Sequence, residues 1–298
     1  MSEPVTGLHE PVLLRETVED LVWRLDGIYI DGTTGTGGHS AKILETLGPN
    51  GRLLCVDQDP APLAIAAERL GADPRVSFHR ASFSELDPIL SEAGRESVDG
   101  ILLDLGLNAW SLTRPENGLS YTIDAPLNMK LDPDLPFTAA EYLARVRLEE
   151  LRELFAEYGN PRRATLYARR LVEARQHTRL ETTSELVRAL AGPRREVLAP
   201  AELSRVFGAL RIAINQEMER LDAFLRQVGR WIAPGGRLVV IAYASHEDRR
   251  IKRAFVQAKD SPFAPRRKKP LVAGPAEVAR NRKARSAKLR VFERRATT

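Results

Sequence analysis

The residues with the clearest chemical signature form a glycine-rich segment that opens with a carboxylate. This segment, Asp31-Gly32-Thr33-Thr34-Gly35-Thr36-Gly37-Gly38-His39, lies between a β-rich run and a helix-like run. Glycines at a strand-to-helix junction let the backbone come close to a ligand. Asp57 ends the next β-rich run, roughly 20 residues later, where a carboxylate can accept hydrogen bonds from ribose hydroxyls. Together these features predict a site for a cofactor that contains a nucleoside.

Two common classes of nucleotide ligand fit this loop poorly. The dinucleotide fingerprint G-x-G-x-x-G/A ends in Gly or Ala, and that position is occupied by Ser40 here. No second nucleotide-binding half follows in the sequence. The string G-x-x-x-x-G-K-[ST] is absent, which disfavours phosphate transfer on a P-loop. A loop that opens with an acidic residue, here Asp31, is instead similar to the S-adenosylmethionine loop of Rossmann-like methyltransferases.

A second candidate pair follows a later apolar run. Residues 98–104 end in Asp104, and the chain continues to Asn108. A carboxylate at the end of a buried strand is costly unless it is solvated or hydrogen-bonded, so Asp104 either faces a substrate or caps the next turn. Asn108 carries both a donor and an acceptor and can orient an amino group. We predict these two residues as the catalytic pair.

The elements that must position these residues alternate between strand and helix. We expect strands at 28–32, 52–56, 75–79 and 98–104, and helices over 14–25, 40–47 and 60–70. After about residue 112 the β patterns stop, and helices are expected near 138–145, 147–158 and 161–175 and from Thr183. One long helix is expected from Leu203 to Ile232, followed by a strand at 237–243 and a final strand near 289–292.

This order predicts an α/β fold with a doubly wound sheet and an inserted all-helical domain. We assign residues 1–112 and 208–298 to a discontinuous Rossmann-like domain. Residues 113–207 form the insertion, for which we expect a role in substrate recognition.

Composition narrows the class of protein further. The longest apolar run, Leu238 to Ala244, is far shorter than the ~18 residues of a membrane-spanning helix. The single cysteine, Cys55, excludes an internal disulfide and any multi-cysteine metal site. No other residues have metal-ligand spacing. We therefore expect a cytoplasmic protein with no membrane contact and no metal.

Positive charge is concentrated near the C-terminus. From Ser245 to Thr298 there are 17 Lys and Arg against 5 Asp and Glu, whereas the rest of the chain has 28 against 35. Such a segment either attracts a polyanion, usually nucleic acid, or is a solvated tail. The candidate phosphate contacts are Arg162, Arg163, Arg169 and Arg170 in the insertion, and Arg266, Arg267, Lys268, Lys269, Arg282, Lys283, Arg285, Lys288 and Arg290.

Strings along nearly the whole chain resemble the MraW (RsmH) methyltransferases, which methylate N4 of a cytidine in small-subunit (16S) ribosomal RNA. The matching strings are HEPVLL from His9, GTGGHS from Gly35, VDQDP from Val56, DGILLDLG from Asp99, ALRIA from Ala209, PGGRL from Pro234, EDR from Glu247 and RSAKLR from Arg285.

The resemblance implies S-adenosyl-L-methionine as cofactor, and small-subunit ribosomal RNA or the assembled small subunit as partner. The cofactor contacts that it implies are Gly37, Gly38, His39, Asp57, Phe83 and Asp104, with Ser111 at the position of a cofactor-contacting glutamine. For the amino group of cytosine, we hypothesise that Asp104 or Asn108 accepts a hydrogen bond from the reacting nitrogen.

Departures from the family pattern cluster on the substrate side. The usual DLGVSS reads DLGLNAWS from Asp104, and the usual SFHSLEDR reads AYASHEDR from Ala242. Ala244 therefore replaces a family histidine, and His246 stands two places later. Two alternatives stay open: methyl transfer to another RNA or DNA base, and a non-catalytic RNA-binding or ribosome-assembly protein that retains the cofactor pocket. The sequence leaves the oligomeric state open.

Overall fold

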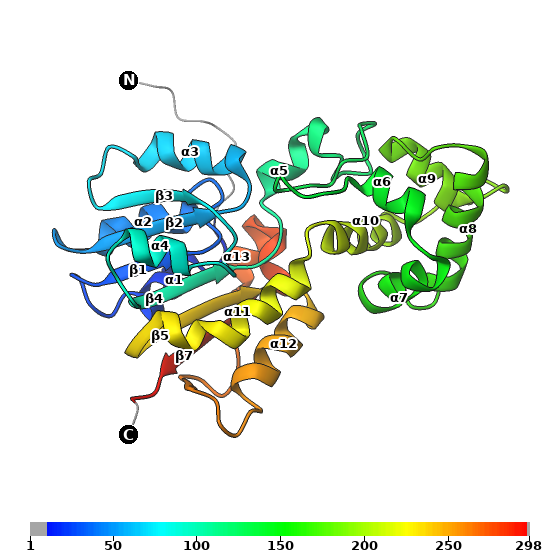
Figure 1. Ribbon diagram of the computed structural model, residues 1–298. Coiled ribbons are helices and arrows are strands. Elements are labelled where there is room, and N and C mark those ends of the chain that lie inside the picture. The colour runs from blue at the N-terminus through cyan, green and yellow to red at the C-terminus, as the bar shows by residue number, and fades with distance from the viewer. Residues whose placement is uncertain (1–10, 297–298) are drawn as a thin grey trace. The chain divides into compact units, whose positions relative to one another are not determined.

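The computed structural model describes residues 11–296 (Figure 1). The chain forms two compact units, the first made of residues 1–108 and 219–298 and the second of residues 109–218. The predicted insertion, 113–207, lies within the second unit.

The first unit is built on a seven-stranded sheet with the strand order β3-β2-β1-β4-β5-β7-β6. Its strands are β1 (Ile28–Asp31), β2 (Arg52–Asp57), β3 (Val76–Arg80), β4 (Val98–Asp104), β5 (Ile232–Ala242), β6 (Phe263–Pro265) and β7 (Lys288–Arg294). The first five strands are parallel, and β7 runs antiparallel to both β5 and β6. The order reverses between β1 and β4, as in doubly wound nucleotide-binding sheets. The predicted Rossmann-like α/β fold is confirmed.

Helices cover both faces of this sheet. They are α1 (Leu14–Leu21), α2 (Gly38–Thr46), α3 (Pro60–Leu70), α4 (Asp87–Glu92), α11 (Glu217–Trp231), α12 (Ser245–Phe255), α13 (Pro275–Arg280) and the 3-10 turn η2 (Arg282–Ser286). One face of the sheet shares a core with α1 and α2. Consecutive residues of β4, Ile101 to Leu103, are fully buried, as expected of a strand that is covered on both sides.

The second unit is helical. Its elements are α5 (Ala109–Thr113), the 3-10 turn η1 (Pro115–Asn117), α6 (Ala139–Arg145), α7 (Leu148–Tyr158), α8 (Ala164–His177), α9 (Thr183–Ala191) and α10 (Pro200–Ile214). Two of its helices, α6 and α9, begin with capping boxes, in which a threonine and a glutamate three residues later satisfy each other's backbone amides.

Three sequence predictions about elements are corrected. The first predicted helix ends at Leu21, and Leu25 lies beyond it with 59% of its surface exposed. The predicted strand at 237–243 begins earlier, at Ile232, and ends at Ala242. The helix predicted at 161–175 spans Ala164–His177.

The long helix expected from Leu203 to Ile232 is two helices, α10 and α11. Gln216 adopts a left-handed backbone conformation (φ 51°), which ends α10. The buried Asn215 side chain accepts a hydrogen bond from the Leu131 amide (2.8 Å) and donates to the Met129 carbonyl (2.8 Å). The Asn215 side chain therefore fastens the end of α10 to the segment before α6. Within residues 11–296, no helix is both long and apolar enough to span a membrane.

Candidate active site

The glycine loop joins the end of β1 to the start of α2, and Asp31 stabilises it from inside. The Asp31 carboxylate is buried and accepts hydrogen bonds from the Ser40 hydroxyl (2.7 Å) and the Thr33 amide (3.2 Å). Burial raises the pKa of Asp31. The Asp31 carboxylate therefore makes its hydrogen bonds to the loop and to the start of α2.

Glycine is required at several loop positions for conformation and for space. Gly35 and Gly37 have φ values of 53° and 82°, in the left-handed region. A Cβ on Gly35 would lie 3.0 Å from Nδ2 of Asn108, and one on Gly38 would lie 2.4 Å from Cγ of Pro11. The loop is thus packed closely between the segment before α1 and the segment after β4.

Asp57 lies at the end of β2 and binds the loop directly. Its Oδ2 accepts a hydrogen bond from the Gly35 amide (2.7 Å), and its Oδ1 accepts one from the Asp59 amide (2.9 Å). Burial raises the pKa of Asp57 to about 7. Each carboxylate oxygen keeps one lone pair beyond these bonds, so Asp57 can still accept hydrogen bonds from a ligand.

Phe83, which follows β3, lies beside the same loop. Its ring packs edge-to-face on Phe224 of α11, with the ring centroids 5.7 Å apart. A Cβ on Gly32 would lie 3.1 Å from the Phe83 Cβ. The structure therefore brings this predicted residue to the carboxyl edge of the sheet.

Asp104, at the end of β4, is held by three groups. Its amide donates to Thr33 Oγ1 (2.6 Å), and its Oδ1 accepts a hydrogen bond from the Tyr243 hydroxyl (2.7 Å). Its Oδ2 lies 3.8 Å from Nδ1 of His39. The carboxylate is therefore fixed in orientation and polarised from both oxygens.

His39 connects Asp104 to the segment that precedes α1. Its Nε2 lies 3.1 Å from the Val12 carbonyl oxygen. Because a carbonyl can only accept, Nε2 carries a hydrogen. A proton on Nδ1 as well would make His39 an imidazolium and its 3.8 Å contact with Asp104 an ion pair. His39 is buried, so both of its ring nitrogens are directed within the protein.

Comparisons with known proteins identify the family of this chain. The MraW methylase family matches residues 6–295. The chain belongs to this family. The ribosomal RNA small subunit methyltransferase H of Thioalkalivibrio sulfidiphilus is 42% identical over 314 residues, covering 99% of each chain. That of Leptothrix cholodnii is 42% identical over 304 residues, covering 96% of this chain and 93% of its own. The resemblance inferred from the motifs is confirmed.

Tyr243 contacts the candidate site, and sequence reasoning missed it. Its Oη contacts Asp104, and its ring lies under Lys283, whose Nζ is 4.3 Å from the ring centroid. Lys283 also donates to the Leu107 carbonyl (3.1 Å). Burial and the nearby Asp104 raise the pKa of Tyr243, so its hydroxyl stays protonated and donates. The only signal in the sequence is its place just after β5, which pairs with β4 at Asp104 and Ile241.

Ser111 belongs to the second unit and lies buried on α5. Its carbonyl accepts a hydrogen bond from Asn117 Nδ2 (3.2 Å). The cofactor contact that the resemblance implies for Ser111 stays a prediction. Among residues 11–296, no three His, Cys, Asp or Glu side chains gather as metal ligands would.

The basic C-terminal segment is folded into the sheet. Asp248 binds Arg290 (2.7 Å) and Lys288 (3.1 Å), and Glu293 binds Arg266 (2.5 Å). These cations are therefore neutralised within the protein. Among the C-terminal phosphate contacts that we predicted, the exposed cations without an ion pair to a described residue are Lys268, Lys269, Arg282 and Arg285.

Proposed function

We propose that this chain transfers a methyl group from S-adenosyl-L-methionine to N4 of a cytidine in small-subunit (16S) ribosomal RNA. The observation that carries the proposal is the Asp104 carboxylate, oriented by Tyr243 beside the glycine loop of a MraW-family methylase. The names of the relatives support a ribosomal RNA substrate.

The chemistry of the side chains fits this cofactor. Asp57 offers free acceptor lone pairs for a ribose diol, and Phe83 offers an aromatic ring beside the loop. The Asp104 carboxylate suits the ammonium group of a methionine moiety. When bound, the cofactor supplies an electrophilic methyl group on a positively charged sulfur.

The protein's main task is to position a weak nucleophile. The exocyclic amine of cytosine shares its lone pair with the ring, and an acceptor on its N–H localises that pair as the new bond forms. Asp104 or Asn108 takes this role, since Asp104 ends β4 and Asn108 follows four residues later at the edge of the sheet. The amine must approach the methyl group in line, at about 3–3.5 Å.

A cytosine paired in a helix hides its amino edge, so the substrate is a single-stranded, looped or flipped nucleotide. We propose that the second unit contributes to holding this RNA. The protein would act in the cytoplasm, where ribosomal subunits are assembled.

Mass spectrometry of small-subunit ribosomal RNA, from cells with and without the gene, tests the proposal. We expect one N4-methylcytidine that disappears on deletion and returns with the wild-type gene but not with Asp104→Asn. If a different methylated base disappears on deletion, that base and not the cytidine is the methyl acceptor. An unchanged set of modifications would favour the non-catalytic alternative.

A further inference from the structure

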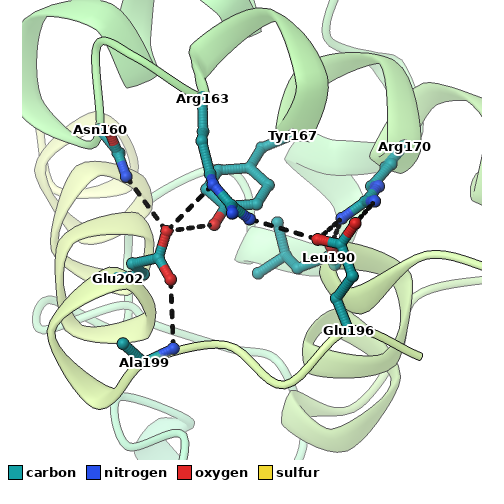
Figure 2. A network of polar contacts seen from close by, with 8 residues as sticks. All are labelled: Asn160, Arg163, Tyr167, Arg170, Leu190, Glu196, Ala199 and Glu202. Carbon is teal, nitrogen blue, oxygen red and sulfur yellow. Dashed lines mark hydrogen bonds and ion pairs between the residues drawn. The ribbon is translucent and has the colours of Figure 1, made fainter. Parts of the chain in front are cut away.

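The second unit carries an internal ion-pair network that joins α8 to α10 and to the loop between α9 and α10 (Figure 2). Glu196, in that loop, binds Arg170 (2.9 Å) and Arg163 (3.2 Å). Glu202, on α10, binds Arg163 (3.3 Å) and accepts a hydrogen bond from the Tyr167 hydroxyl (3.0 Å). Arg163 and Arg170, two of the four arginines in the insertion predicted to contact phosphate, are therefore bound to carboxylates of the same unit.

The network also fixes the loop at both ends. Arg170 donates to the Leu190 carbonyl (2.7 Å), at the end of α9, and the Ala199 amide donates to Glu202 (3.1 Å), at the start of α10. The hydrogen bond from Arg170 lowers the pKa of Glu196, and the one from the Ala199 amide lowers the pKa of Glu202. Both carboxylates are thus held ionised and bonded. The fixed loop still leaves Val197 99% exposed.

Around this network lie five exposed arginines, which we name the arginine surface. Their guanidinium groups have no ion pair or hydrogen bond to any described residue, and they are Arg162, Arg169, Arg194, Arg195 and Arg205. The first two directly precede Arg163 and Arg170 in the chain. The next two precede Glu196, and Arg205 lies close enough to Glu202 to lower its pKa.

The arginine surface has a net positive charge because the two carboxylates of the network are already bound to other arginines. Glu196 and Glu202 neutralise Arg163 and Arg170, which leaves the five exposed guanidiniums in excess. Charge is also uneven along the unit. Residues 160–205 have 10 arginines against 5 acidic residues, whereas residues 139–158 have 3 against 5.

We infer that the arginine surface binds the phosphate backbone of the RNA substrate. A guanidinium presents several N–H donors in a plane that matches two phosphate oxygens, and a rigid support lowers the entropy lost on binding. The inference rests on the proposed function for the identity of the RNA. It assigns the binding to Arg162, Arg169, Arg194, Arg195 and Arg205, and excludes Arg163 and Arg170 as phosphate ligands.

The test measures RNA binding separately from methyl transfer. The probe is small-subunit ribosomal RNA from cells that lack the gene, titrated with full-length protein over a range of salt concentrations. The test variant replaces Arg162, Arg169, Arg194 and Arg195 by Gln. The control variant, Arg152→Gln with Arg179→Gln, removes two exposed arginines of the same unit that already have acidic neighbours.

We expect the fourfold variant to lose roughly tenfold or more in affinity. The slope of log Kobs against log salt should become shallower by about 2 to 3, at ~0.7 per phosphate contact on single strands. The control should stay within about twofold of wild type. A thermal unfolding midpoint and a cofactor affinity equal to those of wild type show that the fourfold variant is folded. Should it unfold, Arg169→Gln alone is expected to lower the slope by about 0.7.

Three outcomes would overturn the inference: wild-type affinity in a folded fourfold variant, an equal loss in the control, or weaker binding to assembled subunits with unchanged binding to naked RNA. The last would identify a ribosomal protein as the partner. Failure of the proposed function is distinguishable, since it would appear as RNA binding without methyl transfer in the wild-type protein.

Discussion

At the scale of single residues, Asp104 is the centre of the polar contacts of the candidate site. Asp104 is held between Tyr243 and His39, and His39 in turn contacts the Val12 carbonyl. Sequence patterns located Asp104 and His39, because each lies at a strand or helix end with a recognisable motif. They missed Tyr243, because its contact with Asp104 depends on the pairing of β4 with β5, and this pairing cannot be read directly from the sequence.

Removing the Tyr243 hydroxyl should slow methyl transfer and also weaken cofactor binding, because the Asp104 carboxylate that it orients is assigned to the ammonium group of the cofactor. Tyr243→Phe keeps the ring under Lys283 but leaves Asp104 Oδ1 without its donor. A hydrogen bond to a charged group contributes about 1.5–3 kcal/mol, so kcat should fall roughly tenfold to a hundredfold. Single-turnover kinetics and calorimetric titration of the cofactor separate the two effects. Unchanged kcat would show that Tyr243 does not position Asp104.

The raised pKa of Asp57 predicts that cofactor affinity depends on pH. The ionised carboxylate is the form that accepts hydrogen bonds at both oxygens, and its pKa is about 7. If only this form binds, affinity should rise about tenfold between pH 6 and pH 8. Calorimetry over this range should show the rise in wild type and in the exposed-site control Asp260→Asn. A similar rise in Asp57→Asn would assign the proton to another group.

The same pKa has the opposite consequence for the stability of the ligand-free protein. In the unfolded chain Asp57 has its ordinary pKa of 3.8, whereas the folded protein retains the proton up to about pH 7. The native state thus binds more protons between these values, and its contribution to the free energy of unfolding falls as pH rises from about 4 to 7. Urea unfolding at pH 5 and pH 8 should show a smaller decline in Asp57→Asn than in wild type. Equal declines would contradict the assignment.

At the scale of elements, the sequence predicted the parallel strands closely but not where the long helix breaks. Predicted strands at 28–32, 52–56, 75–79 and 98–104 match β1 to β4 to within one residue at each end. Their apolar runs are short and bounded by polar or glycine residues. The apolar period of α10 continues into α11, so periodicity cannot show the break at Asn215, which depends on contacts with residues far away in the chain.

Asn215 should therefore be essential to the stability of this junction. Asn215→Ala would leave the partly buried Leu131 amide and the buried Met129 carbonyl without this partner, and Met129 itself has a left-handed backbone (φ 62°). Unsatisfied buried polar groups cost about 1–3 kcal/mol each, so we expect a loss of about 2–5 kcal/mol in the free energy of unfolding. Urea denaturation measures it, with the exposed Glu219→Ala as control. A loss no larger than that of the control would mean that other contacts hold the junction.

At the scale of the whole molecule, the fold divides the basic side chains into two classes, those with acidic partners and those without. Arg163, Arg170, Lys288 and Arg290 are neutralised by acidic partners, whereas the arginine surface and a few C-terminal cations are not. Sequence alone groups both classes together because adjacent arginines on a helix point in different directions. The division decides which substitutions report on nucleic acid binding and which report on folding.

Truncation of the basic C-terminal segment should consequently unfold the first unit. Deleting residues 262–298 removes β6 and β7, including β7's pairing with β5 from Arg237 to Ala242. It also removes the buried Leu289, Val291 and Phe292, each contributing about 1.5–3 kcal/mol, a sum comparable to the ~5–15 kcal/mol that stabilises a typical domain. We expect the truncated chain to lose cooperative thermal unfolding and cofactor binding.

The control is a fourfold variant that removes only exposed cations of the same segment. It should keep the wild-type unfolding midpoint, because these cations have no ion pair to a described residue. Its substitutions are Lys268→Gln, Lys269→Gln, Arg282→Gln and Arg285→Gln. A truncated protein that still binds cofactor with wild-type affinity would contradict this structural role of β7, and would favour the solvated tail, one of the two interpretations of its composition.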